Sequence, residues 1–97
     1  MPDLFPRVSI ITVVYNGEAT LERTILSVKT LNYPNLEYIV VDGASKDGTL
    51  DIIEKFKDVV SMVISEPDKG LYDAMNKGLD LATGDYLWFV NSGDEVA

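Results

Sequence analysis

The chain begins its first regular element with Val8-Ser9-Ile10-Ile11-Thr12-Val13-Val14, which breaks off at Tyr15-Asn16-Gly17. This run is rich in β-branched residues, and it is too continuously apolar for a strand with one face in water. Such a strand belongs in the middle of a parallel sheet, where helices cover both faces. Residues 8–14 therefore predict a buried parallel strand.

The strand–helix unit then repeats along the chain. The elements expected next are a helix over 18–31, a strand over 36–41, a helix from about 50, a strand over 59–64, a helix ending before 83 and a strand over 86–90. Each helix has apolar residues at helical spacing that are expected to pack against the sheet. They are Leu21, Ile25 and Val28 in the first helix, Leu50, Ile53 and Phe56 in the second, and Leu71, Met75 and Leu79 in the third. Short loops between alternating elements require right-handed crossovers. The fold class is therefore α/β, a three-layer α/β/α sandwich with a mostly parallel sheet of about four strands.

The composition limits the classes of function. A chain of 97 residues with 46% hydrophobic content forms one core, so residues 1–97 are expected to be one domain. The net charge of −8 argues against nucleic acid as a partner, because a basic surface supplies most of that affinity. The absence of cysteine excludes disulfide frameworks and thiolate zinc sites. No secretory signal and no apolar run of roughly 20 residues is present, so we expect a cytoplasmic protein.

Polar side chains follow every predicted strand. Tyr15-Asn16 follow the first strand, Asp42 the second, Asp68 the third and Asn91-Ser92-Gly93-Asp94 the fourth. Ligands of open parallel sheets bind beyond the carboxyl ends of the strands. Neighbouring strands, about 4.8 Å apart, would bring such side chains within reach of one ligand. We therefore expect an acidic cleft at this edge of the sheet.

Several of these residues also have a plain structural interpretation. Asp47 precedes a predicted helix and Asp68 lies in a Pro-Asp-Lys-Gly turn, which are typical places for capping and turn residues. Tyr15 either covers the end of the core or offers an aromatic platform to a base, worth roughly 1–3 kcal/mol. Asp73 and Lys77 have the i,i+4 spacing of an exposed helical ion pair. The spacing alone leaves these alternatives open.

The usual phosphate-binding loops are missing from the sequence. Neither G-x-G-x-x-G nor G-x-x-x-x-G-K-[ST] follows the first strand. An acidic cleft would repel a phosphorylated ligand unless a divalent cation lay between them. Oxygen ligands such as Asp94 suit Mg²⁺ or Mn²⁺.

Four motifs in order resemble a known family. Residues 8–16 look like the opening strand of family-2 inverting glycosyltransferases of the GT-A type, and residues 40–49 are similar to their V-D-D-G-S-x-D-G-T motif. Residues 65–78 look like the family's donor-site segment, and residues 82–94 resemble its A-x-G-x-[YF]…D-x-D stretch. The resemblance implies that residues 1–97 are the nucleotide-sugar-binding N-terminal part, a truncated, Rossmann-like GT-A half without the acceptor-binding half.

The resemblance also implies roles for individual residues. The implied donor-binding residues are Thr12, Val13, Tyr15, Asn16, Asp42, Asp68, Lys69, Asn91 and Ser92. Asp42 would accept a hydrogen bond from the base, and Asp94 would coordinate the metal. No catalytic residue is expected within the chain, because the family's general base lies in the acceptor half.

The implied activity is transfer of a sugar, with inversion, from a nucleotide diphosphate-sugar to a hydroxyl acceptor. The expected donor is a uridine diphosphate-sugar, and the expected acceptor is a glycan or a lipid-linked molecule. The parent enzyme is expected to act at the inner face of the membrane, in polysaccharide or envelope synthesis. Two positions depart from the family pattern: Gly43 stands where many members have a second Asp, and Asn91-Ser92-Gly93-Asp94 has one clear carboxylate where D-x-D has two. Weaker metal binding is expected as a result.

Two other classes of function compete with this hypothesis. A receiver-like signalling domain would also use Mg²⁺ at the carboxyl edge of a parallel sheet, but it needs an acidic pair after the first strand, where this chain has Tyr15-Asn16. A non-catalytic nucleotide-binding module would leave one flank of the sheet uncovered after residue 90, and exposed apolar surface promotes self-association. The second alternative predicts a homo-oligomer.

Overall fold

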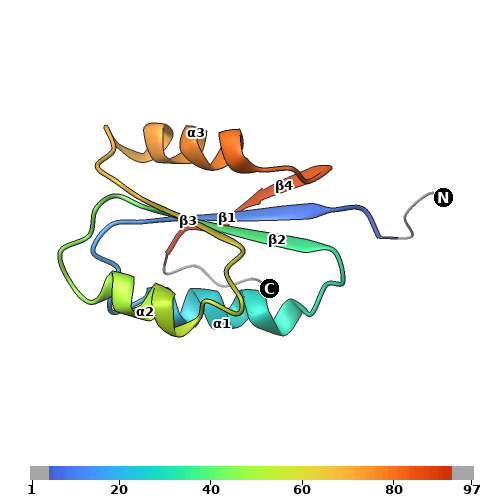
Figure 1. The fold of residues 1–97 in the computed structure, drawn as a ribbon, viewed down its shortest axis with the longest axis horizontal. Coiled ribbons are helices and arrows are strands. Elements are labelled where there is room, and N and C mark those ends of the chain that lie inside the picture. The colour runs from blue at the N-terminus through green and yellow to red at the C-terminus, as the bar shows by residue number, and fades with distance from the viewer. Residues whose placement is uncertain (1–4, 93–97) are drawn as a thin grey trace.

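A computed structural model of the chain describes residues 5–92, which form a four-stranded parallel sheet with helices on both faces (Figure 1). The elements are β1 (Val8–Val14), α1 (Leu21–Leu31), β2 (Leu36–Asp42), α2 (Thr49–Lys55), β3 (Met62–Ser65), α3 (Leu71–Leu81) and β4 (Tyr86–Phe89). The strand order is β3-β2-β1-β4. The α/β class and the three layers predicted from the sequence are confirmed.

The two central strands define the sheet. β1 pairs with β2 along its whole length, from Val8 opposite Leu36 to Val14 opposite Asp42. Nearly all of their side chains are buried, as the apolar run predicted, whereas those of the edge strands β3 and β4 are mostly exposed. The shared register brings the ends of β1 and β2 to the same level, so the loops that follow lie side by side.

Helices α1 and α2 cover one face of the sheet, and α3 covers the other (Figure 1). The core under α1 and α2 is built from Ile10, Val14, Leu21, Ile25, Val28, Tyr38, Val40, Ile53, Val60 and Val90. The core under α3 is smaller and consists of Ile11, Val13, Ile39, Val41 and Ala74. Alternate residues of β1 and β2 therefore serve opposite cores, as the two-residue period of a strand requires.

Three details of the sequence-based expectation are wrong. Helix α1 begins at Leu21 instead of residue 18, because the N–H groups of Thr20 and Leu21 both donate to the carbonyl of Gly17 in a preceding turn. The third strand begins at Met62 instead of residue 59, because the N–H groups of Val59 and Val60 donate to the carbonyl of Phe56 in a turn after α2. In α2, Ile53 is buried as predicted but Leu50 is exposed.

The face that α3 presents to the sheet also differs from the expectation. Its buried residues are Ala74 and Gly78. Met75 is partly buried and packs against the same core as predicted, whereas Leu71 and Leu79 are 50% and 39% exposed. A Cβ atom on Gly78 would lie 2.5 Å from Cγ2 of Ile11, so the helix packs too closely for a side chain at this position. Hydrophobic spacing predicts the apolar residues of the helix, but here the residues that are fully buried against the sheet are the small ones.

A buried carboxylate fixes the end of the sheet away from the carboxyl edge. Glu37 of β2 accepts hydrogen bonds from the Ser9 hydroxyl at 2.8 Å, the Thr83 N–H at 2.9 Å and the Arg7 guanidinium at 3.0 Å. Burial alone would raise the pKa of Glu37, but the hydrogen bonds from Thr83, Ser9 and Arg7 outweigh it and lower the pKa to about 2. The carboxylate thus ties the α3–β4 connection to β1 and β2.

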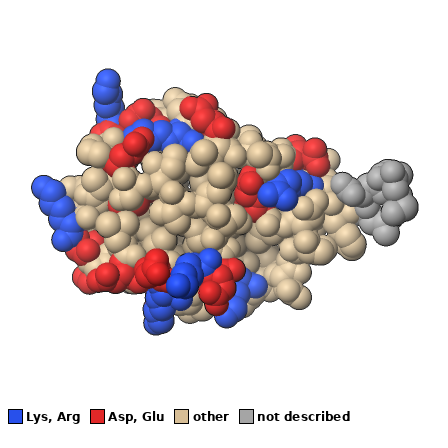
Figure 2. All heavy atoms as spheres, viewed as in Figure 1, with Lys and Arg blue, Asp and Glu red and all other residues tan. Residues whose placement is uncertain are grey.

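On the face shown in Figure 2, acidic and basic side chains are interspersed, mostly over the helical layers. Negative charge on this face is therefore mixed with positive charge and does not form one acidic patch.

Among the helices of residues 5–92, none has the length and hydrophobicity of a membrane-spanning segment.

The lowered pKa of Glu37 predicts a pH-dependent stability. Because the unfolded pKa is near 4.5 and the folded pKa is about 2, the stabilisation is complete above pH 4.5 and is lost as the pH falls towards 2. Glu37→Gln should therefore lower the free energy of unfolding by about 3 kcal/mol at pH 7 and by much less at pH 3. Urea unfolding of both proteins at the two pH values measures this. The exposed Glu54→Gln serves as control and should change stability by less than about 0.5 kcal/mol; an unchanged Glu37→Gln difference at pH 3 would contradict the assignment.

Candidate functional site

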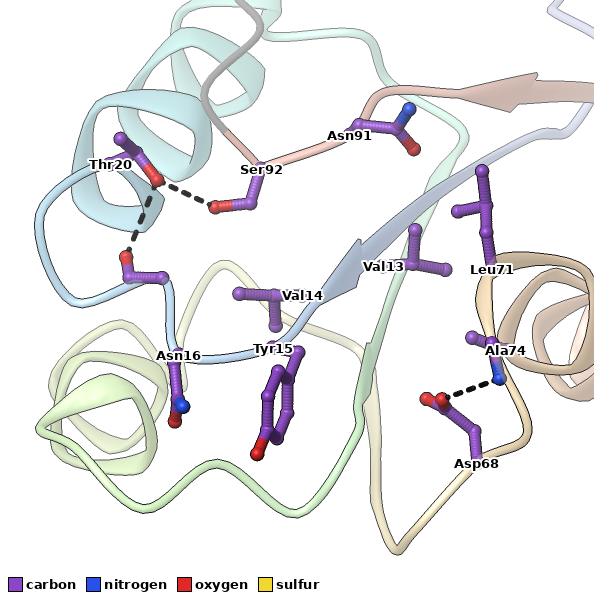
Figure 3. Close-up of a pocket in the computed structure, with 12 residues that line it drawn as sticks. Val13, Val14, Tyr15, Asn16, Thr20, Asp68, Leu71, Ala74, Asn91 and Ser92 are labelled. Atoms are coloured by element: carbon purple, nitrogen blue, oxygen red, sulfur yellow. Dashed lines mark hydrogen bonds between the residues drawn. The ribbon is translucent and has the colours of Figure 1, made fainter.

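A cleft of about 500 Å³ opens at the carboxyl edge of the sheet, between the ends of β1 and β4 and the start of α3 (Figure 3). It is lined by Val13, Val14, Tyr15, Asn16, Gly17, Thr20, Asp68, Gly70, Leu71, Ala74, Asn91 and Ser92. Figure 3 shows Tyr15 from the end of β1, Asp68 from the β3–α3 connection and Asn91 from the end of β4 around the same opening. This is the edge at which the predicted parallel strands indicated a ligand site.

A second hollow of about 390 Å³ adjoins the first. Its lining residues are Tyr15, Gly43, Ala44, Lys46, Pro67 and Asp68. Tyr15 and Asp68 line both spaces, so together they form one continuous surface. Tyr15 is 61% exposed, so its side chain is open to a ligand and does not cover the core.

Asp42 lies beneath this surface and not on it. Its side chain is fully buried, and its carboxylate accepts hydrogen bonds from the N–H and the hydroxyl of Ser45 and from the hydroxyl of Ser65. The Asp42 carbonyl accepts the N–H of Glu66 at 3.0 Å. Asp42 therefore holds the loops after β2 and β3 together.

The loops after β1 and β2 are joined by a ladder of hydrogen bonds. The Asn16 N–H donates to the Ser45 hydroxyl at 2.7 Å, and the Lys46 N–H donates back to Oδ1 of Asn16 at 2.8 Å. The Gly17 N–H donates to the Thr49 hydroxyl at 2.9 Å. These contacts fix the backbone on either side of Tyr15.

Asp47 has the structural role that its place before a helix indicates. Its carboxylate accepts the hydroxyl and the N–H of Thr49 and the N–H of Glu18. The hydrogen bond from the Thr49 hydroxyl is the main cause that lowers the pKa of Asp47. Asp47 thus links the start of α2 to the β1 loop and lies outside both cavities.

Gly43 makes room for Asp68. A Cβ atom at position 43 would lie 2.8 Å from Oδ2 of Asp68 and 3.4 Å from Cδ1 of Tyr15. The missing side chain therefore leaves a space that the Asp68 carboxylate enters. The departure from the family pattern at position 43 is thus accompanied by a carboxylate that reaches the same place from the β3–α3 connection.

The end of β4 is tied to the start of α1. The Ser92 N–H donates to the Val13 carbonyl at 3.3 Å, and the hydroxyls of Ser92 and Thr20 are 3.0 Å apart (Figure 3). A Cβ atom on Gly17 would lie 2.8 Å from the Ser92 hydroxyl, so this corner is closely packed. Asn91 and Ser92 are thereby held at the upper wall of the larger cleft.

The structure separates the residues predicted from the sequence into three groups. Those that line the cavities are Val13, Tyr15, Asn16, Asp68, Asn91 and Ser92. Thr12 and Asp42 are buried, and the Thr12 hydroxyl is hydrogen-bonded to that of Tyr38 at 2.8 Å. Lys69 is exposed and lines neither cavity. Asp94 lies outside the described residues.

Other lining residues were not predicted. They include Gly17, Thr20, Lys46, Pro67, Gly70 and Leu71. Pro67 and Gly70 belong to the turn that the sequence marks around Asp68, and Gly70 has a φ of 120°, so this signal could have found them. Thr20 and Leu71 reach the site because helices begin beside it, which no local pattern shows.

Residues 5–92 contain no group of three or more acidic, histidine or cysteine side chains arranged to hold a metal ion. Among residues 5–92, the oxygen-bearing side chains nearest in sequence to the predicted metal ligand Asp94 are Asn91 and Ser92, on the cleft wall. Their amide and hydroxyl oxygens suit a hard cation but do not complete a coordination sphere. The metal therefore remains a proposal that depends on Asp94.

The fold is an α/β domain with a cleft at the carboxyl edge of a parallel sheet. The chain belongs to glycosyl transferase family 2, whose sequence profile matches residues 9–97. One relative is TuaG of Bacillus subtilis, which its name assigns to teichuronic acid biosynthesis; it is 38% identical over 93 residues, which are 93% of this chain and 37% of TuaG.

Solved structures share the same fold. TarS of S. aureus in complex with UDP-GlcNAc has a TM-score of 0.83 and 29% identity, over 92% of this chain and 27% of that one. The mannosyltransferase PcManGT of Pyrobaculum calidifontis, in complex with GDP-Man and Mn²⁺, has a TM-score of 0.84 and 28% identity, over 92% of this chain and 28% of that one. The chain spans little more than a third of the length of the curated relatives that it matches.

Ala44 gives a stability prediction for the site. Its φ of 62° is left-handed, a conformation that costs a residue with a Cβ about 1–2 kcal/mol, and it stands at the first glycine position of the loop motif quoted above. Ala44→Gly should therefore raise the free energy of unfolding by about 0.5–1 kcal/mol, since the relief of strain exceeds the entropy that glycine adds to the unfolded chain.

Urea unfolding measures this difference. The matched control is Ala19→Gly, at an exposed turn position whose φ is negative, and it should lower stability by about 0.5–1 kcal/mol. If Ala44→Gly destabilises the chain as much as Ala19→Gly does, position 44 is not strained.

Proposed function

We propose that the chain binds a uridine diphosphate-sugar donor at the cleft and that it is the donor-binding part of a glycosyltransferase. The observation that carries this proposal is the continuous surface shared by the two cavities, with an exposed aromatic ring and a carboxylate at its centre. A base, a ribose and a diphosphate need adjoining spaces of this kind. The complexes of TarS with UDP-GlcNAc and of PcManGT with GDP-Man support it.

The smaller hollow suits the base. Tyr15 and Pro67 offer flat apolar surface on which a base can stack. The Asp68 carboxylate accepts hydrogen bonds only, so it fits the N–H edge of a pyrimidine. The buried Asp42 supports this hollow through Ser45 and Ser65 and would not touch the base itself.

The larger cleft suits the diphosphate and the sugar. Asn91 and Ser92 would line the sugar phosphate, and Val13 and Leu71 add apolar wall. A Mg²⁺ or Mn²⁺ ion held by Asp94 would neutralise the diphosphate as it leaves. The Mn²⁺ in the PcManGT complex supports this choice of cation.

The transfer itself needs groups beyond these residues. An acceptor hydroxyl must lose a proton to a general base, which we place in an acceptor-binding part of the longer protein. We propose transfer with inversion to a glycan or lipid-linked acceptor on the cytoplasmic side of the membrane, in envelope polysaccharide synthesis. The teichuronic acid assignment of TuaG supports this pathway class.

Calorimetry with UDP tests donor binding. The chain should bind UDP in the presence of Mn²⁺, more weakly without Mn²⁺, and Asp68→Asn should raise the Kd about tenfold through the loss of one hydrogen bond to a charged group. Asp94→Asn should abolish the effect of Mn²⁺. Asp58→Asn, an exposed residue of the α2–β3 turn, is the matched control and should leave the Kd unchanged. Equal binding by all variants, or none by the wild type, would refute the proposal.

A second candidate is a self-associating module. Tyr86, Leu87 and Trp88 on β4 are 63%, 47% and 42% exposed, and only one side of this strand is paired within the described residues. An open strand edge with large apolar side chains favours pairing with another chain. The proposed partner is a second copy of the chain, joined edge to edge through β4.

Light scattering tests self-association. The chain should form a dimer whose population rises with concentration, and Leu87→Lys should shift it to the monomer because a charge on the edge opposes pairing. Leu50→Lys, at an equally exposed position of α2, should leave the dimer intact. A wild-type chain that stays monomeric at every concentration rules out this candidate.

A further inference from the structure

The connection between β3 and α3, residues 66–70, carries Asp68 to both cavities but has no buried side chain. Asp68 is partly buried, and its neighbours Glu66, Pro67, Lys69 and Gly70 are all exposed. Without apolar anchors, such a segment opens easily unless polar contacts hold it. The placement of the Asp68 carboxylate therefore depends on the groups that bond to this connection.

Lys77 of α3 supplies the central contact. Its Nζ donates to the Pro67 carbonyl at 2.8 Å and lies 3.2 Å from Oε1 of Glu66 and 3.6 Å from Oδ2 of Asp73. An ammonium has three N–H donors, and three oxygens surround this one. The i,i+4 spacing in the sequence left an Asp73–Lys77 ion pair as one interpretation, and the contact with the Pro67 backbone connects that pair to the site.

Lys77 is also unlike a surface lysine. Its side chain is 19% exposed, whereas that of Lys55, which pairs with Glu22, is 63% exposed. Surface ion pairs contribute little to stability, but a hydrogen bond from a charged donor contributes more. Lys77 lines neither cavity, so it acts on a ligand only through the connection.

Helix α3 holds the backbone of Lys77 in a fixed position. Ala74 and Gly78, on either side of it, are buried against the sheet, and Gly78 packs closely on Ile11. Asp73 provides a second tie from the same helix, because its Oδ2 also accepts the Lys69 N–H at 2.9 Å. The connection is thus held on both sides of Asp68 by one rigid element.

We propose that Lys77 is a positioning residue that sets the affinity for the donor by holding the backbone at Pro67, and with it the Asp68 carboxylate beside Tyr15. This inference rests on the proposed function of the cleft. Its structural part, the hold on the connection, can be tested without any ligand.

Amide hydrogen exchange of the free chain tests the hold. Lys77→Met keeps the length and apolar stem of the side chain but removes the ammonium, and it should speed exchange at Lys69 and Gly70 about fivefold or more. Exchange at Val41 in the core should not change. Lys55→Met is the matched control, and in this variant the exchange rates of the Lys69 and Gly70 amides should equal those of the wild type. Unchanged exchange at these two amides in Lys77→Met overturns the proposal whether or not UDP binds.

A double-mutant cycle tests the route to the ligand. Lys77→Met should raise the Kd for UDP about tenfold in the wild-type background and hardly at all in Asp68→Asn, because the carboxylate that it positions is already lost. A full tenfold effect in both backgrounds would mean that Lys77 attracts the diphosphate directly, and it would overturn the positioning role. If exchange changes as predicted but the wild type binds no UDP, the donor-binding function fails and the hold by Lys77 stands.

A second variant covers failure of Lys77→Met to fold. Asp73→Ala removes the carboxylate that pairs with Lys77 and accepts the Lys69 N–H, and it leaves the Lys77 bond to Pro67 in place. It should speed amide exchange at Lys69, while the contact between Lys77 and Pro67 still holds the other residues of the connection. Its effect on the Kd for UDP should therefore be smaller than that of Lys77→Met, about threefold. No change at Lys69 in this variant overturns the proposal.

Discussion

The buried carboxylate of Asp42 is the constraint on which the site depends. A charge removed from water must be matched by hydrogen bonds, and the partners available at the end of β2 are Ser45 and Ser65. Satisfying Asp42 therefore fixes the loop after β2 and the end of β3 together. The ladder between Asn16 and the same loop then places Tyr15 above them.

The opposite side of the cleft follows from the packing of α3. Because Ala74 and Gly78 have little or no side chain, the helix lies close to the sheet, and its first turn reaches the carboxyl edge beside Asp68. The exposed connection before it then relies on Asp73 and Lys77 for its position. One wall of the site is thus set by a buried carboxylate and the other by a closely packed helix.

Two neighbouring positions of the loop after β2 depart from the motif V-D-D-G-S-x-D-G-T. Gly43 leaves a space that the Asp68 carboxylate occupies, so a negative charge remains next to Tyr15 although the second Asp of the motif is absent. Ala44 follows directly, in a left-handed conformation. The loop keeps the shape that the site needs, at the expense of backbone strain.

Local patterns in the sequence determined the class of fold and the edge at which the site lies. The β-branched runs of β1 and β2 indicate buried parallel strands, and parallel strands bring their carboxyl ends, and so Tyr15 and Asp68, to one edge. The order of the four motifs determined the family.

Only the tertiary structure decided which polar residues line the two cavities. Thr12 and Asp42 point into the protein because Tyr38 and Ser65, from other segments, satisfy their polar groups there. The face of α3 was decided in the same way, by its close approach to the sheet at Gly78. Periodicity shows where apolar and polar residues recur, but hydrogen-bond partners and the room for a side chain come from residues distant in the chain.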